Sequence, residues 1–225
     1  MGTGNKPSLC NSVLERTFEA AEGALIGGTI QNHLTESILR TKEEFGIRLA
    51  RFQGDISLQE TAGDLVSEDF LRVEAGHRMG KEEHIQGSDV TAQIMAQSTL
   101  IRAAEFEWVD WKKEQDGAVQ RMVLRLKHPG EGIEVQVIYE LQNGEPYLRK
   151  WLDIKNISRE KVWLVDLDVE TFCTSEWQSS SERGVPIFIG DDFFVGLEFP
   201  TWSRIAEDGG NPTTLEAYCF PWMNR

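Results

Sequence analysis

Apolar and polar residues alternate with a period of two over much of residues 119–170. This period is typical of strands that bury one face and expose the other. Short polar turns interrupt it, and one of them contains Asn143-Gly144, a dipeptide favoured in tight hairpins. The pattern therefore predicts four consecutive strands in an antiparallel meander. Their expected ranges are 119–127, 133–141, 147–155 and 163–170.

The first half of the chain predicts shorter strands of the same kind. Residues 90–108 fit either a helix or two strands, and we expect two strands. We expect a charged loop at 80–88 and a turn at 112–117. The remaining strands are expected at 13–19, 24–31, 37–40, 45–49, 56–59 and 70–75.

A second hairpin is expected at residues 185–200, where two apolar runs flank Gly190-Asp191-Asp192. Pro200 should stop further strand pairing, because proline lacks the backbone N–H. Neither a linker nor an internal repeat is visible, so we expect a single β-sandwich domain over residues 1–225, with residues 1–12 as a flexible lead-in. A catalytic (β/α)8 barrel needs about 250 residues of alternating strands and helices, and this pattern is missing from the sequence.

The charge balance narrows the range of partners. The chain has 225 residues, of which 23 are Lys or Arg and 37 are Asp or Glu, giving a net charge of −14. Nucleic acid requires a basic surface, and an acidic surface is repelled by anionic lipid. We therefore expect no nucleic acid and no membrane partner, and a soluble protein with neutral ligands.

The cysteines indicate neither a metal site nor a disulfide framework. Cys10, Cys173 and Cys219 lie far apart, with no Cys-x-x-Cys pair and no nearby His. We expect buried free thiols, with a Cys173–Cys219 bridge as the alternative. Residues 1–11 lack the apolar core of a secretion signal, which favours a cytoplasmic location.

Aromatic and acidic residues are the candidates for sugar contacts. Sugars stack their C–H faces on exposed aromatic rings, while carboxylates hold the hydroxyls. The candidates are Trp108, Trp111, Trp151, Trp202, Asp191 and Asp192. Core packing is the alternative for each Trp, and turn capping is the alternative for the two Asp. The carboxylates of Asp166, Asp168 and Glu170 alternate along one strand and are expected on a solvated face.

Trp151 departs most from its surroundings, because it lies among the polar residues of its strand. Exposed large aromatic side chains usually mark contact surfaces. We therefore expect Trp151 to contact another sheet, a partner domain or a second copy of the chain, the last of which would make a homo-oligomer.

Three segments resemble a known family. They are Asn11–Arg16, the run Tyr-Leu-Arg-Lys-Trp-Leu-Asp-Ile-Lys-Asn at 147–156, and Gly-Leu-Glu-Phe-Pro at 196–200. They resemble the N-terminal β-supersandwich of α-galactosidase-like glycoside hydrolases (family 36 and relatives), which has a galactose-mutarotase-like fold. The resemblance implies an all-β antiparallel supersandwich. Because the family's domain usually continues beyond Gly-Leu-Glu and this chain stops at Arg225, we expect either a fragment that lacks its last strands or a shortened variant.

The resemblance also implies a function. It suggests a non-catalytic accessory domain that supports binding of a neutral saccharide and packs against a catalytic barrel absent from this chain. The family's nucleophile lies in a Lys-Trp-Asp motif, which Lys150-Trp151-Leu152-Asp153 does not match. No catalytic residue, metal or other cofactor is therefore expected.

Two alternatives remain open. Aldose 1-epimerases share the sandwich and use a His as general acid with a Glu as base. Their Asn-His-x-Tyr-Phe-Asn pattern is matched here only at Asn32-His33. The other alternative is a plain interaction or assembly β-sandwich.

Overall fold

The computed structural model describes residues 7–51, 98–174, 177–178, 186–196, 202–206 and 212–217. Almost every regular element in these ranges is a strand, and every strand pair of known register is antiparallel. The prediction of an all-β antiparallel sandwich is therefore confirmed. The expected strands at 56–59 and 70–75 lie outside the described residues. The strands are β1 (Ser8–Cys10), β2 (Leu14–Ala21), β3 (Ala24–Asn32), β4 (Ile38–Glu43), β5 (Gly46–Ala50), β6 (Ser98–Arg102), β7 (Glu107–Asp116), β8 (Val119–Lys127), β9 (Ile133–Gln142), β10 (Leu148–Asn156), β11 (Trp163–Cys173), β12 (Trp177–Gln178), β13 (Ile187–Ile189), β14 (Phe193–Val195), β15 (Trp202–Ala206) and β16 (Pro212–Ala217).

The chain groups into two compact units. Unit 1 comprises Met1–Gly46, Ile101–Arg159 and Leu167–Tyr218, and unit 2 comprises Ile47–Leu100, Glu160–Asp166 and Cys219–Arg225. In unit 2, Ile47, Leu49 and Ala50 are buried, and Arg51 forms an ion pair with Glu160 at 3.4 Å. All the sites described below belong to unit 1.

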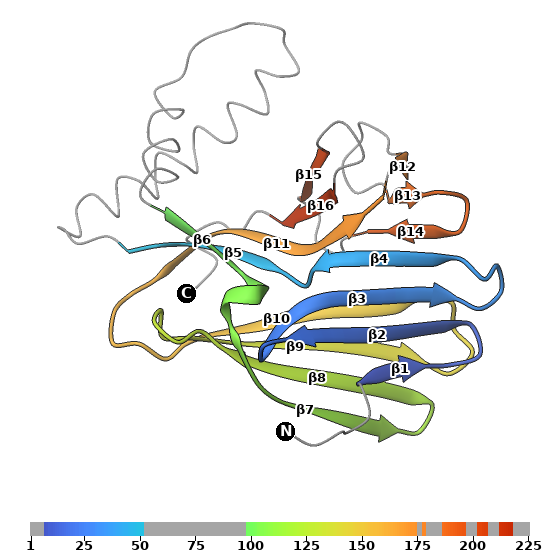
Figure 1. Ribbon diagram of the computed structural model, residues 1–225, viewed down its shortest axis with the longest axis horizontal. Helices are drawn as coiled ribbons and strands as arrows, with labels where there is room; N and C mark the ends of the chain where they lie inside the picture. The colour runs from blue at the N-terminus through green and yellow to red at the C-terminus, as the bar shows by residue number, and fades with distance from the viewer. Residues whose placement is uncertain are drawn as a thin grey trace, which may run out of the picture. The chain divides into compact units, whose positions relative to one another are not determined.

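One sheet of unit 1 is a four-stranded meander in the order β10-β9-β8-β7 (Figure 1). Three of its strands are those predicted at 119–155. The fourth is β7, and its hairpin with β8 turns only at Gly117-Ala118, where Gly117 has φ +56°. The expected turn at 112–117 is therefore wrong for 112–116, which continue the strand.

The strand expected at 163–170 does not complete that meander. It forms the first part of β11, which pairs with β4 and β16 in a nine-stranded sheet. The main path of that sheet is β1-β2-β3-β4-β11-β16-β15, and β5 and β6 branch from it at β11. Residues 163–169 of β11 are all half-buried instead of alternating between buried and exposed. A strand covered partly on both faces does not suit a meander with one wet face, which explains the failed prediction.

Close approach of β3 to its neighbours depends on two glycines. A Cβ at Gly28 would collide with the backbone carbonyl of Thr17 in β2, and one at Gly27 would collide with the carbonyl of Thr41 in β4. Gly27 also has φ +124°, which is strained for other residues. This tight spacing brings Thr41 Oγ1 within 3.2 Å of the Gly28 carbonyl oxygen, to which it donates.

The inner faces of the two sheets form the core of unit 1. From β2 the side chains of Leu14, Arg16 and Phe18 point inward, and all are buried. Phe18 meets Tyr139 of β9 edge to face, with ring centroids 5.1 Å apart. The apolar inner face of the meander consists of Met122, Leu124, Leu126, Ile133, Val135, Val137 and Leu141. Arg16 therefore lies in this core beside apolar side chains of both sheets.

The hairpin predicted at 185–200 is confirmed as far as it is described. Strands β13 and β14 pair antiparallel across a turn at 190–192, where Gly190 has φ +56°. Ile187 and Ile189 are buried against Leu39 and Phe172. Gly-Leu-Glu-Phe-Pro starts at Gly196, and its last four residues lie outside the described residues.

Candidate functional site

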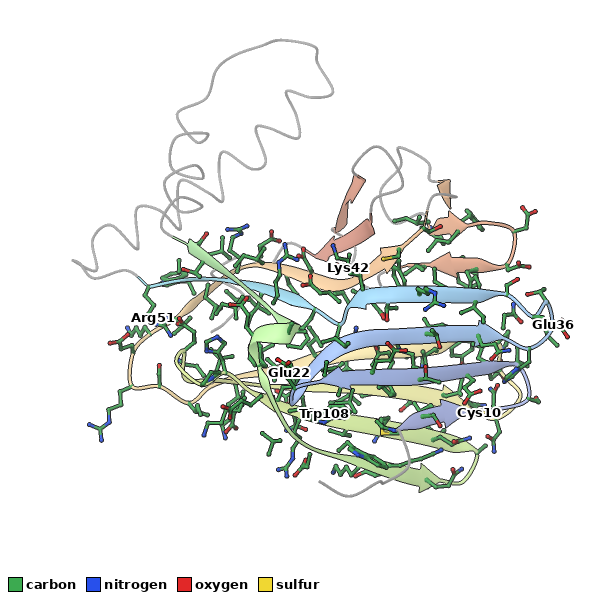
Figure 2. All side chains as sticks on the ribbon, in the orientation of Figure 1. Cys10, Glu22, Glu36, Lys42, Arg51 and Trp108 are labelled. Atoms are coloured by element: carbon green, nitrogen blue, oxygen red, sulfur yellow. The ribbon has the colours of Figure 1, made fainter. Side chains whose placement is uncertain are left out.

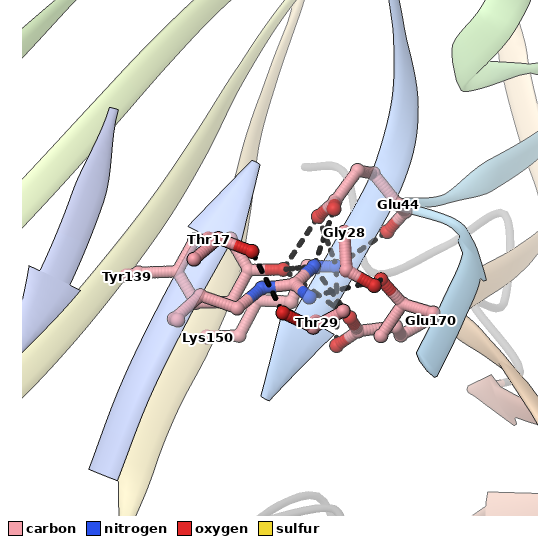
Figure 3. A network of polar contacts seen from close by, with 9 residues as sticks. Thr17, Gly28, Thr29, Glu44, Tyr139, Lys150 and Glu170 are labelled. Atoms are coloured by element: carbon pink, nitrogen blue, oxygen red, sulfur yellow. Dashed lines mark hydrogen bonds and ion pairs between the residues drawn. The ribbon is translucent and has the colours of Figure 1, made fainter. Parts of the chain in front are cut away.

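A group of charged side chains, which includes Glu44, Lys150 and Glu170, lies buried between the two sheets (Figure 3). Arg16 is at its centre, because its guanidinium contacts Glu44, Tyr139 and Glu170. The Arg16 guanidinium is fully buried and forms an ion pair with Glu44, from the bend between β4 and β5. Its Nη2 also lies 2.9 Å from Glu170 Oε1 in β11. Its Nη1 donates to Thr41 Oγ1 at 2.9 Å. Three segments of one sheet thus converge on one cation.

The meander completes this group with Tyr139 and Lys150. The Tyr139 hydroxyl donates to Glu44 Oε2 at 2.5 Å and accepts from Arg16 Nη2 at 3.1 Å. Lys150 Nζ lies 3.2 Å from Glu44 Oε2 and 3.4 Å from Glu170 Oε2. Two cations and two carboxylates balance formally. We call Arg16, Glu44, Tyr139, Lys150 and Glu170 the buried charge network.

The pKa values in this network follow from burial and charge together. Burial alone would raise the pKa of Glu44, but Arg16 and Lys150 outweigh it and lower that pKa below its ordinary value. For Glu170, burial dominates over the same two cations, so its pKa is raised. Burial also raises the pKa of Tyr139, which keeps the phenol protonated and able to donate.

The strand pattern does not predict this network, although the sequence carries one signal of it. Arg16 and Lys150 each occupy the apolar register of their strands, between Leu14 and Phe18 and between Leu148 and Leu152. A cation at a core position needs a buried counter-ion. The counter-ions come from segments 28 and 154 residues away, which a strand pattern does not connect.

Glu170 corrects one specific expectation. It was expected on a solvated face with Asp166 and Asp168, but its side chain is buried in the network. The register of β11 against β16 shifts between Asp168 and Glu170. Such a bulge reverses the alternation of faces, so Glu170 turns inward although a strict period of two places it outside.

The network is arranged for structure more than for chemistry. The side chains of Arg16 and Glu44 are 0% exposed, and both carboxylates are already neutralised by cations. The Arg16 guanidinium also lies 5.1 Å and 5.2 Å from the rings of Phe18 and Tyr139. A substrate would have to displace these partners to reach either carboxylate.

The sugar-contact candidates do not converge on one place. Trp108 and Trp111 both lie on β7, where Trp108 Nε1 donates to the Asp110 carbonyl oxygen at 3.0 Å (Figure 2). Trp111 pairs with Leu124, whose side chain faces inward, whereas Trp151 is on the opposite, outer face. Trp202 is in β15, and its side chain lies outside the described residues.

The acidic candidates lie in the β13–β14 turn. Asp192 accepts hydrogen bonds from Ser37 Oγ through its carboxylate and from Asn32 Nδ2 through its carbonyl oxygen, the latter at 3.3 Å. These contacts join the hairpin to the β3–β4 turn. Asp191 is exposed beside it.

The outer face of the meander carries an ordered array of charges. Arg121 contacts Glu140 at 2.6 Å across the strand pair, and Arg125 forms an ion pair with Asp110. The hydrogen bonds from Arg125 lower the pKa of the Asp110 carboxyl. Between these pairs runs a cross-strand row that begins at the exposed Trp151. The row is Trp151, Ile138, Val123 and Lys112.

Three potential metal ligands meet at the end of β1, where Cys10 lies (Figure 2). Cys10 Sγ is 3.9 Å from His33 Nε2, and a Glu15 oxygen lies within 4.8 Å of both. The expected burial of the free thiols is wrong for Cys10 and Cys173, which are both free and exposed. Each is the final residue of its strand and faces away from the core. Cys219 lies outside the described residues.

Comparisons with protein-family models and with curated proteins find no match for this chain. Among the described residues, no helix is long and apolar enough to cross a membrane. The family resemblance therefore depends on the three sequence segments alone.

Proposed function

We propose that this chain is a non-catalytic, galactose-mutarotase-like β-sandwich module of an α-galactosidase-like glycoside hydrolase. In this role it supports binding of a neutral saccharide and packs against a catalytic barrel. The observation that carries the proposal is the position of Trp151 on the outer face of the meander, with 38% of its surface exposed.

The surroundings of Trp151 suit a sugar platform. The Arg121 guanidinium lies 5.6 Å from the Trp151 ring centroid, and Glu140 holds Arg121 in place at 2.6 Å. A ring held by its neighbours loses little freedom on binding, which favours affinity. The nearby carboxylates and guanidinium groups supply hydrogen-bond partners for sugar hydroxyls.

The buried charge network supports the non-catalytic part of the proposal. Glycoside hydrolysis needs two carboxyl groups about 5–10 Å apart with room for the sugar between them. In the described interior, Glu44 and Glu170 are paired carboxylates, and Arg16 and Lys150 already form ion pairs with both of them.

Fluorescence titration with α-galactosyl oligosaccharides tests the proposal. We expect a saturable change in tryptophan emission with the unchanged protein. Trp111 is 42% exposed but lies on the inner face of the meander, so Trp111→Ala is the matched control and should show the same change. We expect no saturable change with Trp151→Ala. Loss of binding in Trp111→Ala but not in Trp151→Ala, or no binding by any form, would refute the saccharide role of the outer face.

Enzyme assays on the same preparation test whether the chain is non-catalytic. No nitrophenol should be released from an aryl α-galactoside, and polarimetry should show no catalysed interconversion of galactose anomers. Turnover that disappears in His33→Ala would replace the accessory module with an epimerase. In addition, Trp151→Ala should lower the free energy of unfolding by less than about 3 kcal/mol. That value is the lower end of the range for deleting a large buried aromatic side chain.

An interaction module is the second candidate, and one observation favours it. Phe188 and Phe194 lie directly opposite each other on the β13–β14 hairpin and are 50% and 62% exposed. An exposed pair of this kind suits a protein contact. Association of the chain in sedimentation experiments that is lost in Phe194→Ser, together with no sugar binding, would support this candidate over the accessory module.

A further inference from the structure

The strand register brings Cys10, Glu15 and His33 to one face of the sheet. Cys10 of β1 pairs directly with Glu15 of β2, and Glu15 pairs with Gln31 of β3. His33 follows Gln31 by two positions, so it continues the same face. Leu14 and Arg16 flank Glu15 and point into the core, which places all three ligand groups on the opposite, solvent side.

The backbone that carries these groups is held by specific hydrogen bonds. Asn11 Oδ1 accepts from the backbone N–H groups of Val13 and Leu14, both at 2.8 Å, and fixes the β1–β2 turn. Asn11 Nδ2 donates to the carbonyl oxygens of Gln142 and Glu145. The His33 N–H donates to the Val13 carbonyl oxygen at 2.8 Å. The three side chains therefore start from a fixed scaffold.

We propose that Cys10, Glu15 and His33 bind a divalent transition-metal ion of the zinc class, with water as the fourth ligand. Thiolate, imidazole and carboxylate are the ligands that zinc takes in proteins. With bonds of about 2.0–2.3 Å, two ligands of a tetrahedral zinc lie about 3.3–3.6 Å apart. The Cys10–His33 separation of 3.9 Å is close to that value, and the other separations stay within 4.8 Å. Rotation of the three side chains suffices to bring the ligand atoms to the spacing of a tetrahedral site.

The charges also suit a dication. Binding releases the thiol proton, which Cys10 now donates to the Asn11 carbonyl oxygen, so one thiolate and one carboxylate neutralise the ion. Lys113 is the nearby opposing charge, and its Nζ donates to the Ser8 carbonyl oxygen at 3.2 Å. Cys10 and His33 are 23 positions apart in the sequence, so the spacing of short metal-binding motifs does not indicate this cluster.

Titration with Co²⁺ and Zn²⁺ tests the site independently of any activity. With one equivalent of Co²⁺, we expect the visible bands of a four-coordinate ion and a near-ultraviolet thiolate charge-transfer band. Calorimetry with Zn²⁺ should give one site. Affinity should fall at least about tenfold in His33→Gln and Glu15→Gln, and the charge-transfer band should disappear in Cys10→Ser.

Two further variants make the result specific. Cys173→Ser removes the second exposed thiol of the described residues and should leave metal binding unchanged. Lys113→Gln should tighten metal binding by removing the opposing charge. Far-ultraviolet circular dichroism confirms that each variant is folded. Absence of stoichiometric binding, or binding that is equal in Cys10→Ser and His33→Gln, would overturn the site.

Discussion

The two faces of the β7–β10 meander use the same kinds of charged residue in opposite surroundings. On β9, Tyr139 belongs to the buried charge network, while the next residue, Glu140, pairs with Arg121 on the outer face. On β10, Lys150 points inward and Arg149 is exposed. The comparison shows that alternation along a strand decides whether a charge is a core component or part of a solvated surface.

Burial changes what such contacts contribute. A buried charge without its partner retains a large desolvation cost, so breaking a buried pair is expensive. In an exposed pair, the remaining charge stays solvated when its partner is removed, and salt screens the attraction between the two charges. The network around Arg16 should therefore contribute strongly to the free energy of unfolding. The outer array should contribute little to it and remains available for ligand binding.

Replacing Arg16 in the buried charge network and Arg121 on the outer face of the meander gives the largest expected difference. Arg16→Met leaves Glu44 and Glu170 buried with Lys150 as their only remaining cation in the network, and we expect it to lower the free energy of unfolding by about 3–5 kcal/mol. The matched variant Arg121→Met should not shift the urea midpoint beyond error. Equal shifts in the two variants would contradict the comparison.

The two buried carboxylates should respond oppositely to pH. The pKa of Glu44 is lowered in the fold, so its contribution to stability is present above the ordinary value of 4.5 and is lost as pH falls through the folded pKa. The pKa of Glu170 is raised, so its contribution is present below 4.5 and is lost as pH rises through the folded pKa.

Urea unfolding at pH 3.5 and pH 7 measures this difference. The destabilisation caused by Glu44→Gln should be larger at pH 7, and that caused by Glu170→Gln should be larger at pH 3.5. Glu140→Gln on the outer face is the control. The same pH trend in both buried variants would contradict the opposite pKa shifts of Glu44 and Glu170.

Local pattern predicted the strands better than it predicted their partners. The alternation from 119 to 155 gave three strands of the meander close to their observed bounds, because each buries one face against a single apolar layer. It assigned β11 to the wrong sheet, because strand pairing depends on contacts distant in sequence. The bulge that turns Glu170 inward likewise leaves no mark in a period of two.

The candidate sites show the same limit. Trp151 lies among the polar residues of β10, beside exposed Arg149, Asp153 and Lys155. The expected contact of Trp151 with another sheet, a partner domain or a second copy of the chain stays a prediction. By contrast, the Arg16 network and the Cys10–Glu15–His33 cluster each form only when separate strands align. Neither can be recognised from the spacing of residues in one segment.

Double-mutant cycles at two salt concentrations test the central claim most directly. One cycle joins Arg16→Met with Glu44→Gln inside the sandwich, and the other joins Arg121→Met with Glu140→Gln on the outer face. We expect a coupling free energy between Arg16 and Glu44 that is the same in about 0.1 M and 1 M salt, since buried charges are little screened. No coupling beyond error is expected for the outer pair at either concentration. A buried coupling that vanishes in high salt, or an outer coupling as large as the buried one, would contradict the assignment of stability to the interior network and recognition to the outer face.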